Sequence, residues 1–279
     1  MELNIDGLRL YYEIYGTGIP IVMIHGFGPD HRILKGCMEP IFKSKKGYKR
    51  IYFDLPGMGK TKGVNWIHNA DEMLDLILKF IQKVIPEQKF LIIGESYGAY
   101  LARGLIEKKG HDIYGAIFIC PGIIMDRSKR ILPEFHVIIR DSEFLSSLSP
   151  QDAKEFEEMH VIQTKAIWER YKDEVDSGLK LADEKFLTKY YEEGYSFTFD
   201  HELINQKFEK PSLFIMGRQD NIVGYHDAYK IIENYPRASF VILDKADHDL
   251  QIEQESIFNV LVEEWLERVV EFKSIEIIK

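Results

Sequence analysis

The sequence predicts an α/β protein with a mostly parallel central sheet and helices on both faces. Short runs rich in Ile, Val, Phe and Tyr show little polar alternation, which is typical of parallel strands buried on both faces. The first run reads as a hairpin arm, and the runs are residues 8–16, 19–26, 48–54, 89–94, 114–122, 212–217 and 238–244. Between them, residues 73–85 carry apolar side chains at helical spacing, and a final helix is expected near residues 251–270. Strands that alternate with helices indicate an α/β sheet.

The alternation stops after the fifth run and resumes at the sixth, which divides the chain. Residues 123–207 are expected to form a helical cap inserted between strands, and residues 1–122 and 208–279 are expected to form the core. Ser149 can cap a helix that has Pro150 in its first turn. The insert is rich in aromatic residues, which are expected mainly to pack within it and against the sheet.

Charge and composition exclude several classes of partner. The net charge of -9 argues against binding to nucleic acid or an anionic membrane, because both depend on clustered Lys and Arg. The first residues lack the pattern of a signal peptide, and no apolar run is long enough to span a membrane. Cys37 and Cys120 alone provide no disulfide framework. The sequence therefore predicts a cytoplasmic monomer or homodimer whose partner is a small molecule.

Ser96 lies in the stretch GESYG, between a strand and an amphipathic helix that Gly110 closes. A strand that turns directly into a helix at a serine makes a tight bend, and side chains two positions away would collide with the neighbouring backbone. Gly94 and Gly98 relieve that crowding. This pattern predicts a nucleophilic serine at the carboxyl end of the sheet.

A nucleophilic serine needs a base, and the base needs an orienting carboxylate. Asp220 follows the strand at 212–217, and His248 follows the last strand. The chain order Ser96, Asp220, His248 is that of enzymes whose nucleophile lies on such a turn. We therefore predict these three residues as nucleophile, acid and base.

Two of these assignments have alternatives. Asp220 is also suited to a turn, and Asp126 lies beyond an earlier strand from which some acids reach the histidine. His248 could be a solvated loop histidine, and His226 is a second candidate at the start of a helix. His25 is expected to brace its loop rather than to take part in the chemistry.

The oxyanion of an acyl-transfer reaction needs fixed donors, which backbone amides provide best. The stretch HGFG at residues 25–28 follows a strand, and its glycine-rich turn can aim the amide of Phe27 inward. The amide of Tyr97 follows the nucleophile directly. We predict these two amides as the oxyanion hole.

Two motif fragments do not indicate a cofactor or a metal. The stretch GMGKT at residues 57–61 ends like a phosphate-binding loop, but Asp54 stands where that motif requires glycine. The stretch HELIN at residues 201–205 has Asn205 where a zinc-protease helix has its second histidine. The sequence predicts no cofactor and no metal site.

Taken together, these motifs resemble the α/β-hydrolase family, in particular its small members with a helical cap. The resemblance covers essentially the whole chain and rests on five stretches in family order: HGFG, DLPGMGKT, GESYGA, GRQD and ADHD. It implies the α/β-hydrolase fold and a structural turn at Asp54, Gly57, Gly59 and Thr61. Glu95 and Ala99 depart from the more common pattern around the serine and weaken assignment to a named subfamily.

The resemblance and the residues predict a serine hydrolase, a carboxylesterase that forms an acyl-enzyme and takes small to medium carboxylic esters. Two alternatives use the same fold: a carbon-carbon bond hydrolase and a peptidase that releases an N-terminal residue. A ligand receptor that keeps the triad is a further alternative of a different class. Repeated turnover would distinguish an enzyme from such a receptor.

Overall fold

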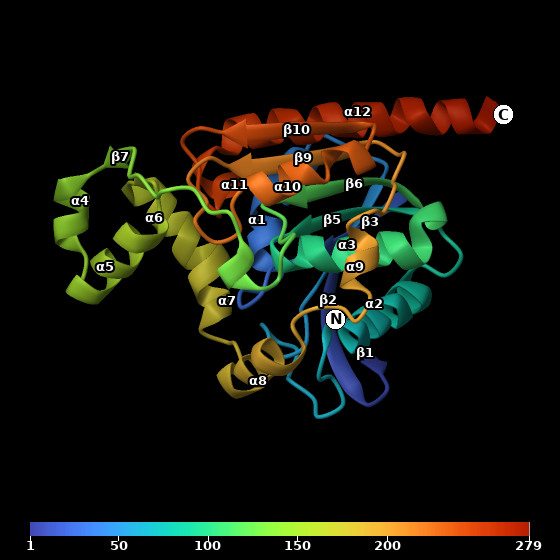
Figure 1. Ribbon diagram of the computed structural model, residues 1–279, viewed down its shortest axis with the longest axis horizontal. Helices are drawn as coiled ribbons and strands as arrows, with labels where there is room; N and C mark the ends of the chain where they lie inside the picture. Colours follow the sequence, from blue (N-terminus) through green and yellow to red (C-terminus); the bar gives the residue numbers. More distant parts are fainter. Residues whose placement is uncertain (279) are drawn as a thin grey trace.

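The computed structural model describes residues 1–278, which form an eight-stranded sheet with helices on both faces (Figure 1). The strand order is β1-β2-β4-β3-β5-β6-β9-β10. The strands are β1 Glu2–Ile5, β2 Leu8–Tyr15, β3 Ile19–Ile24, β4 Tyr48–Phe53, β5 Phe90–Glu95, β6 Ile113–Ile119, β9 Ser212–Gly217 and β10 Ala238–Leu243. The pairs β1–β2 and β2–β4 are antiparallel, whereas the pairs from β4 to β10 are parallel. The predicted fold class is therefore confirmed.

The helices of the core flank this sheet. They are α1 Arg32–Phe42, α2 Ala70–Val84, α3 Tyr97–Lys109, α10 His226–Lys230, α11 Leu250–Glu253 and α12 Glu255–Ile278, with 3-10 turns at Gly110–Asp112 and Ile232–Asn234. The helix predicted from the period of residues 73–85 is α2, which Asn69 caps by accepting a hydrogen bond from the Glu72 amide. Among the helices described up to residue 278, none is both long and apolar enough to cross a membrane.

Alternate residues of each strand supply two separate cores, one on each face of the sheet. On β3, Val22 and Ile24 pack with the apolar faces of α2 and α3, whereas Ile21 and Met23 pack with those of α1 and α12. All four side chains are buried. Burial on both faces explains why the strands read as nearly continuous apolar runs.

Residues 123–207 form a mostly helical segment with one short pair of parallel strands, β7 Ile139–Arg140 and β8 Ile162–Gln163. Its helices are α4 Ser142–Ser147, α5 Pro150–Met159, α6 Lys165–Tyr171, α7 Ser177–Leu179, α8 Glu184–Gly194 and α9 Asp200–Leu203, with a 3-10 turn at Arg127–Lys129 and a π-helical turn at Lys172–Asp176. Ser149 caps α5 as predicted, by accepting from the Asp152 amide at 3.1 Å.

The inserted segment contacts the edge of the sheet where the parallel strands end. In Figure 1, α4 to α7 lie on the side to which β9 and β10 point. The amide of Asp183 donates to the Gly57 carbonyl at 2.8 Å, and Gly178 lies directly against Asp30. The turns that follow the strands therefore lie between the sheet and the insert.

Candidate functional site

Ser96 lies at a strained turn between β5 and α3. Its φ of 52° and ψ of -116° are unusual for a residue with a side chain. A Cβ at Gly94 would lie 2.5 Å from the Ala99 Cα, and one at Gly98 would lie 2.0 Å from the Ile24 carbonyl oxygen. Both glycines are therefore required by close backbone contacts, which hold the serine side chain at the end of the sheet.

Gly98 provides a test of this packing. We expect Gly98→Ala to lower the free energy of unfolding by about 3 kcal/mol, because the atom that the new methyl meets is backbone and cannot turn aside. Gly110→Ala is the control: its Cβ would lie 3.7 Å from the nearest atom, and its φ of -54° suits any residue. Urea unfolding measures both, and equal stability of the two variants would contradict the steric argument. Gly110 occupies the predicted cap position of α3, in right-handed helical conformation.

The structure brings Ser96, Asp220 and His248 together. Ser96 Oγ lies 2.9 Å from His248 Nε2, and His248 Nδ1 lies 3.0 Å from Asp220 Oδ2. Asp220 is fully buried, and its Oδ1 accepts from the amides of Ile222 and Val223 at 2.9 and 3.1 Å. These amides fix the carboxylate, so that only Oδ2 faces the imidazole.

The charges of Asp220 and His248 stabilise each other. Burial alone would raise the pKa of Asp220, but the charge of His248 and its hydrogen bond lower it. Burial alone would lower the pKa of His248, but the charge of Asp220, their hydrogen bond and the charge of Glu95 raise it to about 10. His248 therefore holds a proton firmly, and its basic form increases as the pH rises.

The alternative residues lie in other environments. Asp126 is exposed, accepts from the Ser128 amide at 3.1 Å and pairs with Lys129. His226 begins α10, where its ring stacks on its neighbour Tyr225. His25 is buried and accepts from the Leu55 amide through Nε2 at 2.9 Å, so that it braces its loop.

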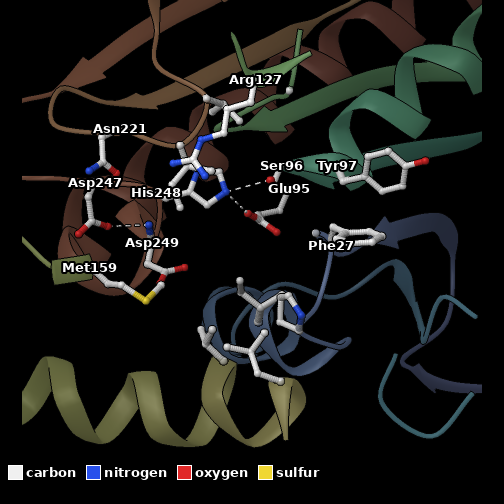
Figure 2. A pocket seen from close by; sticks show the side chains of 18 of the residues that line it. Phe27, Glu95, Ser96, Tyr97, Arg127, Met159, Asn221, Asp247, His248 and Asp249 are labelled. Atoms are coloured by element: carbon white, nitrogen blue, oxygen red, sulfur yellow. Dashed lines mark hydrogen bonds and ion pairs between the residues drawn. The ribbon is translucent and has the colours of Figure 1, made fainter. Parts of the chain in front are cut away.

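Phe27 and Tyr97 line the same pocket as Ser96, and Figure 2 shows their side chains beside it. Within the described residues, the Phe27 amide makes no hydrogen bond, whereas the next amide, that of Gly28, donates to Met58 Sδ. The Tyr97 amide is the first of α3, and the first amides of a helix have no acceptor within it. Both donors are thus available next to the serine.

The pocket has a volume of about 380 Å³ and walls from both the core and the insert. Its apolar side chains include Phe27, Ile33, Met125, Met159, Val175, Leu179, Tyr191 and Tyr195. Two arginines also line it. Arg130 donates to the carbonyls of Ile124, Met125 and Ile222, whereas the Arg127 side chain makes no hydrogen bond or ion pair with any residue up to 278.

A family model described as serine aminopeptidase, S33, matches residues 20–255. The chain belongs to this α/β-hydrolase family. It is therefore a hydrolase, and the resemblance inferred from the sequence is confirmed.

Relatives of this hydrolase have more than one activity. A pimeloyl-[acyl-carrier protein] methyl ester esterase of Legionella pneumophila (strain Corby) is 25% identical, over 93% of this chain and 100% of the relative. A 2-hydroxy-6-oxo-6-(2'-aminophenyl)hexa-2,4-dienoic acid hydrolase of Metapseudomonas resinovorans is 22% identical, over 92% and 87%. The crystal structure of an alpha/beta superfamily hydrolase from Oenococcus oeni PSU-1 superimposes with a TM-score of 0.86 at 28% identity, over 93% of this chain and 96% of that one.

Sequence reasoning did not assign a role in the site to Glu95 of the hydrolase. The side chain is 2% exposed, and its Oε1 lies 3.4 Å from His248 Nε2. Figure 2 shows the imidazole facing both Ser96 and Glu95. The available signal was a charged residue that ends an apolar strand directly before the serine.

Sequence reasoning also missed the contact that joins the His248 loop to the insert. Glu253 accepts from the amides of Val161 and Ile162 at 3.0 Å and from the Asp247 amide at 2.7 Å. Asp247 in turn accepts from the Val161 amide at 3.1 Å. These buried carboxylates tie the loop before His248 to the inserted segment.

Proposed function

We propose that this hydrolase cleaves small to medium carboxylic esters through an acyl-enzyme formed on Ser96. The observation that carries the proposal is the continuous hydrogen-bonded row from Ser96 through His248 to Asp220 beside two unpaired backbone amides. This row can remove a proton from a hydroxyl and stabilise the charge that results. The esterase among the relatives also supports it.

In the proposed reaction, Ser96 Oγ attacks the ester carbonyl while its proton passes to His248 Nε2. The amides of Phe27 and Tyr97 donate to the oxyanion, and Asp220 stabilises the imidazolium. The tetrahedral intermediate expels the alcohol, which takes the proton from His248. Water then attacks the acyl-enzyme by the same steps in reverse order and releases the acid. A fluorophosphonate should label Ser96, and failure to label it would contradict this assignment.

We further propose that residues 123–207 act as the cap of the site and restrict the acyl chain. Leu179 and Met159 from the insert line the pocket together with residues of the core, and a packed pocket of about 380 Å³ has little room for surplus methylenes. Long-chain triglycerides should therefore be poor substrates, without activation at a lipid interface.

An ester series tests the restriction on chain length. We expect kcat/KM to be greatest for short or medium acyl chains and to fall about tenfold or more toward sixteen carbons, because each surplus methylene is worth about 1 kcal/mol or more. The measurement is kcat/KM for p-nitrophenyl esters of about two to sixteen carbons. Leu179→Ala should move the optimum to longer chains. A maximum at the long end, or a sharp rise above the solubility limit, would show a lipase-type lid instead.

Carbon-carbon bond hydrolysis is a second candidate, favoured by Arg127. Its guanidinium lines the pocket without an ion-pair partner among residues 1–278, and it is suited to pair with a substrate carboxylate. The relative from Metapseudomonas resinovorans is named for hydrolysis of a dienoic acid. Turnover of ring-cleavage dienoates faster than of any ester in the series would favour this candidate. Turnover of aminoacyl anilides would instead favour the aminopeptidase alternative.

A further inference from the structure

Glu95 occupies a position that packing alone does not explain. Its carboxyl group lies between the loop at Gly26 and the ring of His248, and a Cβ at Gly26 would lie 2.3 Å from Glu95 Oε2. Oε2 is buried and makes no hydrogen bond of normal geometry with any described residue. An unpaired buried carboxyl oxygen is costly. An apolar side chain of similar size would avoid that cost.

The other oxygen of Glu95 contacts the nitrogen that carries the proton in the proposed reaction. His248 Nε2 lies 2.9 Å from Ser96 Oγ and 3.4 Å from Glu95 Oε1. When the imidazole is protonated, this single N–H therefore faces two acceptors. Asp220 already accepts from the opposite nitrogen. The imidazolium thus has a carboxyl group on each side.

We propose that Glu95 is a positioning residue that acts with Asp220 to hold the proton on His248, so that the pH range of activity depends on both carboxyl groups. The inference rests on the proposed function, because it assigns the base to His248. In the resting enzyme above the pKa of Glu95, the ion pair between Glu95 and His248 competes with deprotonation of Ser96. After proton transfer, the same contact stabilises the imidazolium opposite the oxyanion.

The surroundings of the pair support the direction of this effect. Burial raises the pKa of Glu95 to about 8, against the charge of His248 and the amide of Gly26. Asp249 lies in the loop after β10 and Asp220 in the loop after β9. The negative charges of both raise the pKa of Glu95 and of His248. Tyr195 from the insert, Cys120 after β6 and Cys37 on α1 also interact with Glu95, and burial raises the pKa of all three, so that they stay neutral.

The sign of the pH dependence follows from these contacts. Above the pKa of Glu95, its negative charge stabilises protonated His248 and delays the appearance of the basic form. Removing that charge should lower the pKa of His248 and move the acidic limb of the kcat/KM profile to lower pH. A less basic imidazole is also a weaker proton acceptor, so that the plateau at high pH should fall.

The experiment compares pH profiles of kcat/KM for the wild type and Glu95→Gln with a short-chain ester. We expect the acidic limb to move by about one pH unit to lower pH, the shift that an opposite charge in contact produces. The variant should therefore be faster than the wild type at low pH and slower at high pH. Glu192→Gln, which removes an exposed charge from α8, should leave the limb in place. A purely structural role would lower the whole profile without moving it.

A second variant and a wild-type measurement keep the inference testable if Glu95→Gln does not fold. Glu95→Asp withdraws the carboxyl group and should give a smaller shift in the same direction. In the wild type, the ring nitrogens of His248 followed by NMR should show two inflections, one for each member of the pair. Coincident limbs in a folded variant, or a single inflection in the wild type, would overturn the inference. The two proposals can fail separately. If Ser96→Ala is inactive but the acidic limbs of the wild type and Glu95→Gln coincide, the inference about Glu95 is overturned and the proposed function stands.

Discussion

Replacing Ser96 with alanine is expected to lower kcat for ester hydrolysis by about a millionfold, the loss seen when the nucleophile of a cooperating triad is removed. His248 and Asp220 would remain 3.0 Å apart, but they would have no hydroxyl to activate. Water bound in its place is a poorer nucleophile with less favourable orientation. The oxyanion donors would still give a small residual rate.

The stability of Ser96→Ala should hardly change, because the hydroxyl makes one contact at a partly exposed position and the strained backbone remains. The measurement is kcat of the purified variant, with urea unfolding to verify the fold. Ser128→Ala, at an exposed serine after β6, is the matched control and should retain full activity. Activity of Ser96→Ala above about one per cent of wild type, after contamination is excluded by active-site titration, would show that Ser96 is not the nucleophile.

Most of the sheet could be predicted from the sequence because burial on both faces leaves a strong signal. The runs at 19–26 and 89–94 correspond to β3 and β5, each buried by helices from two sides. Weak signals come from short strands. Strand β1 has four residues and one buried side chain, and β7 and β8 have two residues each. Segments this short form strands because of the strands they pair with, and their own sequence pattern does not reveal them.

The three predicted catalytic residues could be found because they follow strands whose carboxyl ends meet at one edge of the sheet. Their roles do not depend on details of packing. Glu95 was different: its importance arises from the distance between its carboxyl group and His248, which no spacing along the chain reveals. The contact between Glu253 and Val161 joins positions about ninety residues apart and depends on how the insert folds over the core.

Replacing Asp220 with asparagine is expected to lower kcat by about 10⁴-fold, the loss seen when the carboxylate of such a triad becomes an amide. An amide can donate to His248 Nδ1 and so favour the wrong tautomer, in which Nε2 carries the proton and cannot accept one from Ser96. The imidazolium also loses the charge that contributes most to its raised pKa. The fold should persist, since the amide oxygen can still accept from Ile222 and Val223 at the positions they now occupy.

The variant Asp126→Asn is the control for Asp220→Asn, because both remove one negative charge beyond a strand of the same sheet. Asp126 contacts Ser128 and Lys129 instead of His248, so that its replacement should leave kcat nearly unchanged. The pH profile of kcat shows whether the loss of activity in Asp220→Asn comes from a direct effect on His248 or from a general disturbance of the site. If Asp220 acts on His248, the residual activity of Asp220→Asn should appear at lower pH than in the wild type, because the imidazole has lost a stabilising anion. A large loss of kcat in Asp126→Asn, together with an active Asp220→Asn, would place the catalytic acid after β6. Asp220 would then not be the residue that orients His248 and stabilises its imidazolium.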